Sequence, residues 1–214
     1  MRVDVLSAEQ VAVLDRLRTV PSVADFYLAG GTALALRHGH RRSIDFDFFR
    51  AEPFDGYALG GALEAVFAPA LEWLPSGERT LHMRLETVST SFFQLPYPLL
   101  EPVQPTPWGF GLASDLDVAV MMVEAVAGRG SRKDFVDLRV LCHRGIRLDE
   151  LLEDFDRKYG TTRADRYHRL RALAFFEDAE RQPMPDMLVP FDWAECKTFF
   201  AAEAARLLAA GLEG

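Results

Sequence analysis

The sequence contains few cysteines and no long apolar run. Its 214 residues include only two cysteines, Cys142 and Cys196, and these show no metal-ligand spacing. A disulfide-stapled fold and a cysteine-rich zinc site are therefore excluded, and the two thiols are expected to be reduced. The first residues lack the apolar core of a signal peptide, and no apolar stretch is long enough to cross a bilayer. We expect a soluble, cytoplasmic protein without a membrane partner.

The chain also lacks an excess of basic residues. It carries 24 Lys and Arg against 32 Asp and Glu, which gives a formal net charge of -8. This balance argues against a large nucleic-acid-binding surface, although a local basic patch would still be compatible with binding an RNA end. Hydrophobic residues make up 49% of the sequence, which is enough to bury a substantial core.

The prolines predict how the chain is divided. Those between residues 96 and 107 exclude a regular helix or a central strand in that segment. Before it, short apolar runs alternate with helical patterns, and after it every apolar pattern has helical spacing. The sequence therefore predicts an α+β fold, with a mixed sheet and flanking helices in residues 1–107 and a helical C-terminal region in residues 108–214.

Apolar spacing and cap residues predict the individual elements. Ser7 and Gln10 form a capping box at the start of the first helix. Strands are expected at residues 26–29, from residue 44 to 49, and at residues 71–74, 80–85 and 88–95. Further helices are expected at residues 32–38, 57–67, 115–127, 132–143, 149–159, 163–180 and 192–210.

The stretch from residue 26 to residue 49 concentrates the functional signals. A short aromatic and aliphatic run leads into Gly30 and Gly31, and a helical pattern follows from Thr32. Glycine permits a sharp turn and lets a ligand approach main-chain N–H groups, while a helix N-terminus favours anions. This half of the stretch predicts a cradle for phosphate groups.

Two aspartates complete that stretch. If a strand begins near Ile44, Asp45 and Asp47 share one face, because successive side chains point to opposite faces. Neighbouring carboxylates repel each other, and a hard divalent cation would relieve this repulsion. Taken singly, an Asp-x-Asp pair or a Gly-Gly pair is more often structural. Their order and proximity favour phosphoryl or nucleotidyl transfer.

A second charged cluster lies in the helical region. Arg129, Arg132 and Lys133 precede Asp134 and Asp137, and these aspartates are three residues apart on one helix face. Taken alone, the pattern favours a solvated helix with internal ion pairs.

Together these motifs resemble those of the AbiEii/AbiGii toxin family, nucleotidyltransferases of the DNA polymerase beta superfamily. The resemblance is carried by Gly-Gly-Thr at residues 30–32, by residues 43–49, and by residues 132–138, which are similar to the family's Lys-Asp-x-x-Asp-Leu motif. It implies a metal-dependent transfer of NMP from an NTP to a tRNA 3′ end or a protein hydroxyl. It also implies a toxin of a type IV toxin–antitoxin or phage-defence system, with a cognate antitoxin as partner.

The resemblance further implies roles for individual residues. The residues expected to be catalytic and to hold Mg²⁺, or Mn²⁺, are Asp45 and Asp47. The residues expected to bind the nucleotide are Gly30, Gly31, Thr32, Ser43 and Arg129. In the second motif, which in such proteins lies beside the nucleotidyltransferase cleft, Lys133 and Asp134 are expected to contact phosphate or support acid–base chemistry. Asp137 is expected to hold a basic side chain in position.

The sequence departs from the family pattern at two points. Met122 stands where a phosphate-binding lysine is expected, five residues after Asp117, and methionine carries no positive charge. A third carboxylate on a later strand is also missing, since Glu86 falls at an expected turn. Two alternatives therefore stay open: a catalytically weakened nucleotide- or RNA-binding protein, and an interaction protein that mainly binds an antitoxin.

Overall fold

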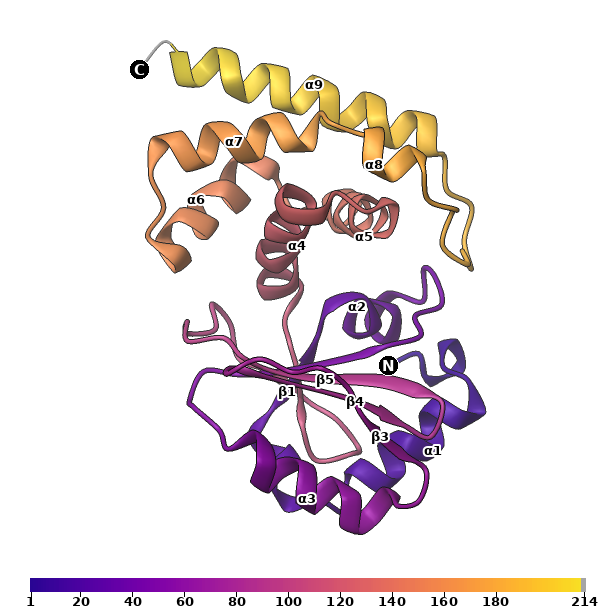
Figure 1. Ribbon diagram of the computed structural model, residues 1–214. Coiled ribbons are helices and arrows are strands. Elements are labelled where there is room, and N and C mark those ends of the chain that lie inside the picture. The colour runs from indigo at the N-terminus through magenta and orange to yellow at the C-terminus, as the bar shows by residue number, and fades with distance from the viewer. Residues whose placement is uncertain (213–214) are drawn as a thin grey trace. The chain divides into compact units, whose positions relative to one another are not determined.

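The computed structural model describes residues 1–212 of the chain, which is divided into two compact units (Figure 1). The first unit comprises Met1–Ser114 and the second Asp115–Gly214. The division proposed from the sequence, after residue 107, lies a few residues before this boundary. The intervening segment contains a short strand that pairs within the first unit.

The first unit is built on a seven-stranded mixed sheet. In spatial order, its strands are β3 (Leu71–Trp73), β4 (Thr80–Leu85), β5 (Val88–Gln94), β2 (Phe46–Arg50), β1 (Tyr27–Ala29), β7 (Gly111–Leu112) and β6 (Gln104–Pro105). Strand β2 is antiparallel to β1 and parallel to β5, and β1 is parallel to β7. The predicted α+β class with a mixed sheet is confirmed.

Helices cover both faces of this sheet. Helices α1 (Ala8–Leu17) and α3 (Gly56–Phe67) lie on one face, and α2 (Gly30–His38) lies on the other (Figure 1). The short 3₁₀ helices η1 (Val3–Val5) and η2 (Pro21–Asp25) flank α1 in the chain. The predicted capping box is confirmed, because Ser7 Oγ accepts from the Gln10 backbone N–H and the Gln10 side chain accepts from that of Ser7.

Aromatic side chains form the core beneath the central strands. Phe46, Phe48 and Phe92 have no exposed surface. The rings of Phe48 and Phe92 are stacked, with centroids 5.1 Å apart, and Phe110 meets Phe48 edge-on at 5.0 Å. Burial of three such rings contributes several kcal/mol, at ~1.5–3 kcal/mol for each fully buried side chain. This core holds β2 and β5 in a defined register.

The start of β2 differs from the prediction. The strand begins at Phe46 rather than near Ile44, whose side chain is 75% exposed. The backbone carbonyls before Phe46 accept hydrogen bonds from side chains of α1 and α2 instead of from a neighbouring strand. Gln10 Nε2 donates to the Ser43 carbonyl at 2.8 Å, and Thr32 Oγ1 donates to the Asp45 carbonyl. These bonds draw the segment toward α1 and α2, so that Asp47 lies in the strand and Asp45 just before it.

The second unit is helical, as predicted. Its helices are α4 (Asp115–Arg129), α5 (Arg132–His143), α6 (Leu148–Tyr159), α7 (Arg163–Leu173), α8 (Glu177–Glu180) and α9 (Trp193–Leu212). A single helix predicted over residues 163–180 is wrong, because the chain leaves the helix after Leu173. There Phe176 packs on Phe135 at 5.1 Å and on Trp193 at 6.2 Å. None of the helices in the described residues has the length and apolarity needed to span a membrane.

A fully buried ion pair joins two helices of the second unit. Lys158 Nζ in α6 donates to Asp117 Oδ1 in α4 at 2.7 Å, and neither side chain has exposed surface. Two charges removed from water remain stable only when they are paired and hydrogen-bonded. The packing of α6 on α4 therefore depends on this contact.

Replacing Lys158 tests that dependence. We expect Lys158→Met to lower the free energy of unfolding by about 3–5 kcal/mol, because Asp117 would lose its buried cation. Urea denaturation followed by circular dichroism measures the change. The matched control is Arg157→Met, which removes an exposed ion pair with Asp154 and is expected to change stability by less than about 1 kcal/mol. Equal stability of the two variants would contradict the assigned importance of the pair.

Candidate active site

The predicted phosphate cradle and the predicted carboxylate pair lie together at one end of β1 and β2. Ala29, the last residue of β1, is paired with Asp47 across the antiparallel ladder. Gly30 follows with a left-handed φ of 68°, and a Cβ atom at this residue would lie 3.2 Å from Asp47 Oδ2. The backbone angle therefore favours glycine, and the missing side chain leaves room for the close approach of the carboxylate.

The N-terminus of α2 begins at this glycine. Its N-cap is Ala29, and no side chain caps the helix there within the described part of the chain. Unsatisfied N–H groups in the first turn of a helix are donors for an anion, and the helix dipole favours negative charge. The residues that supply these groups are Gly30, Gly31 and Thr32, so the three predicted cradle residues occupy consecutive positions at the helix start.

Thr32 and Ser43 are involved in ordering the loop before β2. The Thr32 side chain is 2% exposed, and its hydroxyl donates to the carbonyl of Asp45. The Ser43 carbonyl accepts from Gln10, while the residue itself is half-buried. Thr32 therefore fixes the backbone that carries the first carboxylate, in addition to its place at the helix start.

The donor set at this end of the sheet suits a hard cation. Asp45 and Asp47 are both half-buried. No cluster of three or more His, Cys, Asp or Glu side chains able to hold a metal occurs in residues 1–212. Mg²⁺ commonly takes one or two carboxylates from a protein and completes its shell with water and substrate phosphates. Two carboxylates next to an open helix N-terminus fit that pattern.

Two further polar residues share the face that carries Asp47. Ser91 on β5 is paired with Asp47, and His82 on β4 is paired with Ser91. His82 Nδ1 and Ser91 Oγ lie 2.9 Å apart, so the two side chains are hydrogen-bonded. Sequence reasoning missed this pair because no local pattern reveals which residues of distant strands become neighbours. The available signal was the placement of Ser89 and Ser91 on the strand face opposite Val88, Thr90 and Phe92.

The acidic residue considered for a third carboxylate lies elsewhere. Glu86 occupies the turn between β4 and β5, with a φ of 56°, and forms an ion pair with Arg16 of α1. The turn predicted at this residue is confirmed. At the strand position beside Asp47, the chain has a serine linked to a histidine.

In the second unit, Asp134 is the centre of a hydrogen-bonded turn. Its carboxylate is 1% exposed and accepts from Arg129 Nε and Nη2, each at 2.8 Å, and from Ser131 Oγ at 2.6 Å. A bidentate contact of this kind gives defined geometry as well as energy. Asp134 therefore orders the connection between α4 and α5, while the Arg129 side chain stays 60% exposed.

The other residues of the motif differ in their contacts and in their exposure to solvent. Arg132 contacts Glu180 at 3.0 Å and lies over the ring of Trp193 at 5.0 Å. Lys133 is exposed and has neither a hydrogen bond nor an ion pair within the described residues. Asp137 is 1% exposed, and Met122 is 4% exposed. Of the three basic residues Arg129, Arg132 and Lys133, Lys133 is the one without an ion pair among the described residues.

The two cysteines are unsuited to nucleophilic chemistry. Both are free, and burial raises the pKa of each thiol to about 12. At neutral pH they are therefore protonated, whereas nucleophilic attack and binding of soft metals require the thiolate.

Comparisons with known proteins show a matching family and a relative of similar length. Residues 12–98 match the family described as "Nucleotidyl transferase AbiEii toxin, Type IV TA system". An uncharacterized protein of Aquifex aeolicus (strain VF5) is 37% identical over 207 residues, which cover 95% of this chain and 98% of that protein.

Solved structures show the same fold. MenT4, a nucleotidyltransferase toxin from Mycobacterium tuberculosis H37Rv, is similar with a TM-score of 0.58 and 18% identity over 92% of this chain and 82% of that one. A putative nucleotidyltransferase from Helicobacter pylori is similar with a TM-score of 0.52 and 16% identity, over 97% of this chain and 98% of the other.

Substitution of Gly30 tests the close approach at the start of α2. We expect Gly30→Ala to destabilise the protein by about 1–2 kcal/mol, because an L-residue is strained at this φ. The added methyl group would also press on the Asp47 carboxylate. Thermal denaturation measures the effect. The control is Gly61→Ala in α3, where a Cβ meets no atom within 4 Å and where alanine is expected to stabilise the helix by roughly 0.5–1 kcal/mol. Stabilisation by both variants would refute the strained assignment of Gly30.

Proposed function

Since the chain belongs to the AbiEii family of nucleotidyltransferase toxins of type IV toxin–antitoxin systems, we propose that it transfers NMP from an NTP to a hydroxyl group in a reaction that requires Mg²⁺ or Mn²⁺. The observation that carries this proposal is the contact between Gly30 and Asp47. It brings a phosphate-binding helix start within a few ångströms of a carboxylate that is able to hold a metal ion.

In this proposal, Asp45 and Asp47 hold the cation, and the first turn of α2 binds the triphosphate. Main-chain N–H groups at Gly30, Gly31 and Thr32 donate to phosphate oxygens, and Ser43 lies at the edge of the same loop. A cation held by these carboxylates would supply charge stabilisation at the α-phosphate. The β1–β2 ladder fixes the backbone of Asp47 beside the start of α2, and the Thr32 hydroxyl holds the backbone of Asp45. This order is present before the substrate arrives, which is the preorganisation that electrostatic catalysis requires.

The His82–Ser91 pair supplies a route for the acceptor's proton. The attacking hydroxyl would donate to Ser91 Oγ, and the proton of Ser91 would pass to Nδ1 of His82. The new bond forms between the acceptor oxygen and the α-phosphorus, and pyrophosphate leaves. A general base within hydrogen-bond reach contributes by removing the proton as the bond forms.

In the second unit, we assign the phosphate-contacting role to Lys133. Its exposed ammonium is unpaired within the described residues, so it is available for a phosphate. Arg129 contributes further positive charge, and Asp134 holds that guanidinium in a bidentate contact. Asp137 is given the supporting role of positioning a basic side chain. These assignments rest on motif correspondence and on the contacts within this unit.

The proposed acceptor is a tRNA 3′ end or a protein hydroxyl. The proposed partner is a cognate antitoxin in the cytoplasm. The two proteins would form a toxin–antitoxin or phage-defence system. The net charge of -8 favours recognition of a small feature, such as an RNA end, over binding along an extended nucleic-acid backbone.

A second candidate function is that of a catalytically weakened nucleotide-binding protein. It is favoured by Met122, an almost fully buried methionine at the position where the motif resemblance implies a lysine.

Replacing the carboxylates tests the transferase proposal. Asp45→Asn and Asp47→Asn are each expected to lower the rate of transfer about a hundredfold or more, which corresponds to a few kcal/mol of lost charge stabilisation. The measurement is transfer of label from each of the four α-³²P NTPs, with Mg²⁺ or Mn²⁺, onto total tRNA and onto protein in a cell extract.

The control for this experiment is Glu78→Gln, an exposed carboxylate in the loop before β4. It is expected to leave both activity and stability unchanged. Full activity in either aspartate variant would rule out the assigned metal ligands. NTP binding without any transfer, in a protein shown to be folded, would favour the weakened binder instead.

Lys133 and its neighbour Arg132 provide a matched comparison. Lys133→Met is expected to raise the KM for NTP about tenfold with little change in melting temperature, because the exposed lysine side chain forms no hydrogen bond or ion pair within the described residues. Arg132→Met is expected to lower the melting temperature, since Arg132 contacts Glu180 and the Trp193 ring. Steady-state kinetics and thermal denaturation of both variants distinguish the two roles. An unchanged KM for Lys133→Met would remove the lysine from the site.

A further inference from the structure

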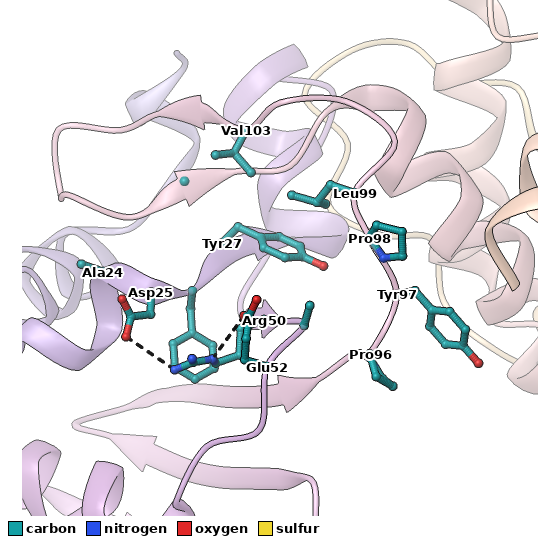
Figure 2. A pocket seen from close by; sticks show the side chains of 13 residues that line it. Ala24, Asp25, Tyr27, Arg50, Glu52, Pro96, Tyr97, Pro98, Leu99 and Val103 are labelled. Carbon is teal, nitrogen blue, oxygen red and sulfur yellow. Dashed lines mark ion pairs between the residues drawn. The ribbon is translucent and has the colours of Figure 1, made fainter.

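A cavity of about 670 Å³ lies in the first unit at the opposite end of β1 and β2 from the carboxylate pair. Its strand side is formed by Tyr27 at the start of β1 and Arg50 at the end of β2, and its other side by Tyr97, Pro98 and Leu99 (Figure 2). Sites for small molecules have this size and this mixture of apolar walls with a few polar groups.

Arg50 contributes a positively charged guanidinium to the lining of the cavity. Its side chain is 19% exposed, and its guanidinium lies over the Phe26 ring at 5.3 Å. Figure 2 shows it between Asp25 and Glu52, with ion pairs of 3.5 and 3.9 Å, which are longer than good hydrogen bonds. Its Nε has no hydrogen-bond partner among the described residues. The Nε itself is buried, so the groups that a ligand is able to use are the Nη donors, which no hydrogen bond shorter than the 3.5 Å ion pair engages in the described part of the chain, and the carboxylates of Asp25 and Glu52, which are 65% and 71% exposed.

The net charge of the side chains that line the cavity restricts the chemical class of ligand that binds there. Two carboxylates against one guanidinium leave the cavity with a net charge of about -1, which disfavours a phosphate or another anion. The apolar side chains favour a flat, uncharged ring. Such a ring has to present hydrogen-bond acceptors to Arg50 and donors to Asp25 or Glu52. A nucleobase edge combines these groups: guanine accepts from arginine, and the amino groups of bases donate to carboxylates.

We propose that this cavity binds a nucleobase between Arg50 and the apolar segment at Pro98 and Leu99. The choice of ligand rests on the proposed function, since nucleotidyl transfer brings nucleobases to the protein, whereas the cavity and the long ion pairs of its guanidinium do not depend on it. Arg50 lies three residues beyond Asp47 on β2, about 10 Å along the strand, and this odd spacing turns the two side chains to opposite faces of the sheet. The base is either that of the NTP or that of a nucleotide in an RNA acceptor.

The experiment uses free nucleosides, which carry no phosphate and need no metal. Binding of adenosine, cytidine, guanosine and uridine to the full-length protein is measured by saturation-transfer NMR and titration calorimetry without divalent cations. At least one nucleoside is expected to bind. Arg50→Met is expected to weaken this binding about tenfold or more, through loss of the contacts to the base edge.

A second variant in the cavity distinguishes a loss of nucleoside binding from a loss of folding. Leu99 belongs to the apolar segment on the side of the cavity opposite the strands, and Leu99→Trp fills the cavity from there while Arg50 keeps its ion pairs. This variant is also expected to weaken nucleoside binding about tenfold. Arg84→Met is the matched control, since Arg84 on β4 forms an exposed ion pair with Glu72 outside the cavity. Thermal denaturation establishes that each variant is folded.

The outcomes separate this proposal from the proposed function. Nucleoside binding that survives Asp47→Asn but is lost in Arg50→Met and Leu99→Trp supports the cavity, whether or not transfer is detected. A rise in KM for NTP in Leu99→Trp then identifies the base as that of the donor, and a rise in KM for RNA alone identifies the acceptor. Absence of nucleoside binding by the folded protein, or binding that both cavity variants leave unchanged, overturns the proposal.

Discussion

The close approach of the Gly30 backbone to the Asp47 carboxylate is the contact on which the candidate site depends. It exists because β1 and β2 are paired with Ala29 opposite Asp47, and because Gly30 adopts a left-handed conformation as the chain enters α2. A side chain at residue 30 would strain the backbone and press on the carboxylate. One ladder register thus brings an anion-binding helix start and a cation-binding group into the same small region.

The aromatic core is what keeps that register. Phe46 and Phe48 alternate with Asp47 along β2, and Phe92 stacks on Phe48 from the neighbouring strand. A slip of one residue would bring the carboxylate into the core and a phenyl ring into water, so the burial energy of the aromatic face opposes it. The same strand ends at Arg50, and its two ends therefore carry the carboxylates and the proposed base-binding cavity.

In the second unit, charged residues are mainly engaged with one another. Asp134 binds Arg129 and Ser131, and Lys158 neutralises Asp117 in a fully buried contact. Such pairs restrict the geometry of the helices, because a lost partner would leave an uncompensated buried charge. The exposed Lys133 differs from them in having no partner in the described residues, which makes it the most direct test of ligand contact in this unit.

The sequence by itself determined the fold class, most of the helices and strands, the capping box at Ser7 and the family, because these follow from local periodicity and from motif order. It placed the start of β2 too early, since hydrogen bonds from Gln10 and Thr32 to that segment are long-range. Only the tertiary structure decided that Ser91 and His82 stand beside Asp47, and that Arg50 lies between Asp25 and Glu52. Such neighbours are set by strand register and by packing of distant segments, which no local pattern encodes.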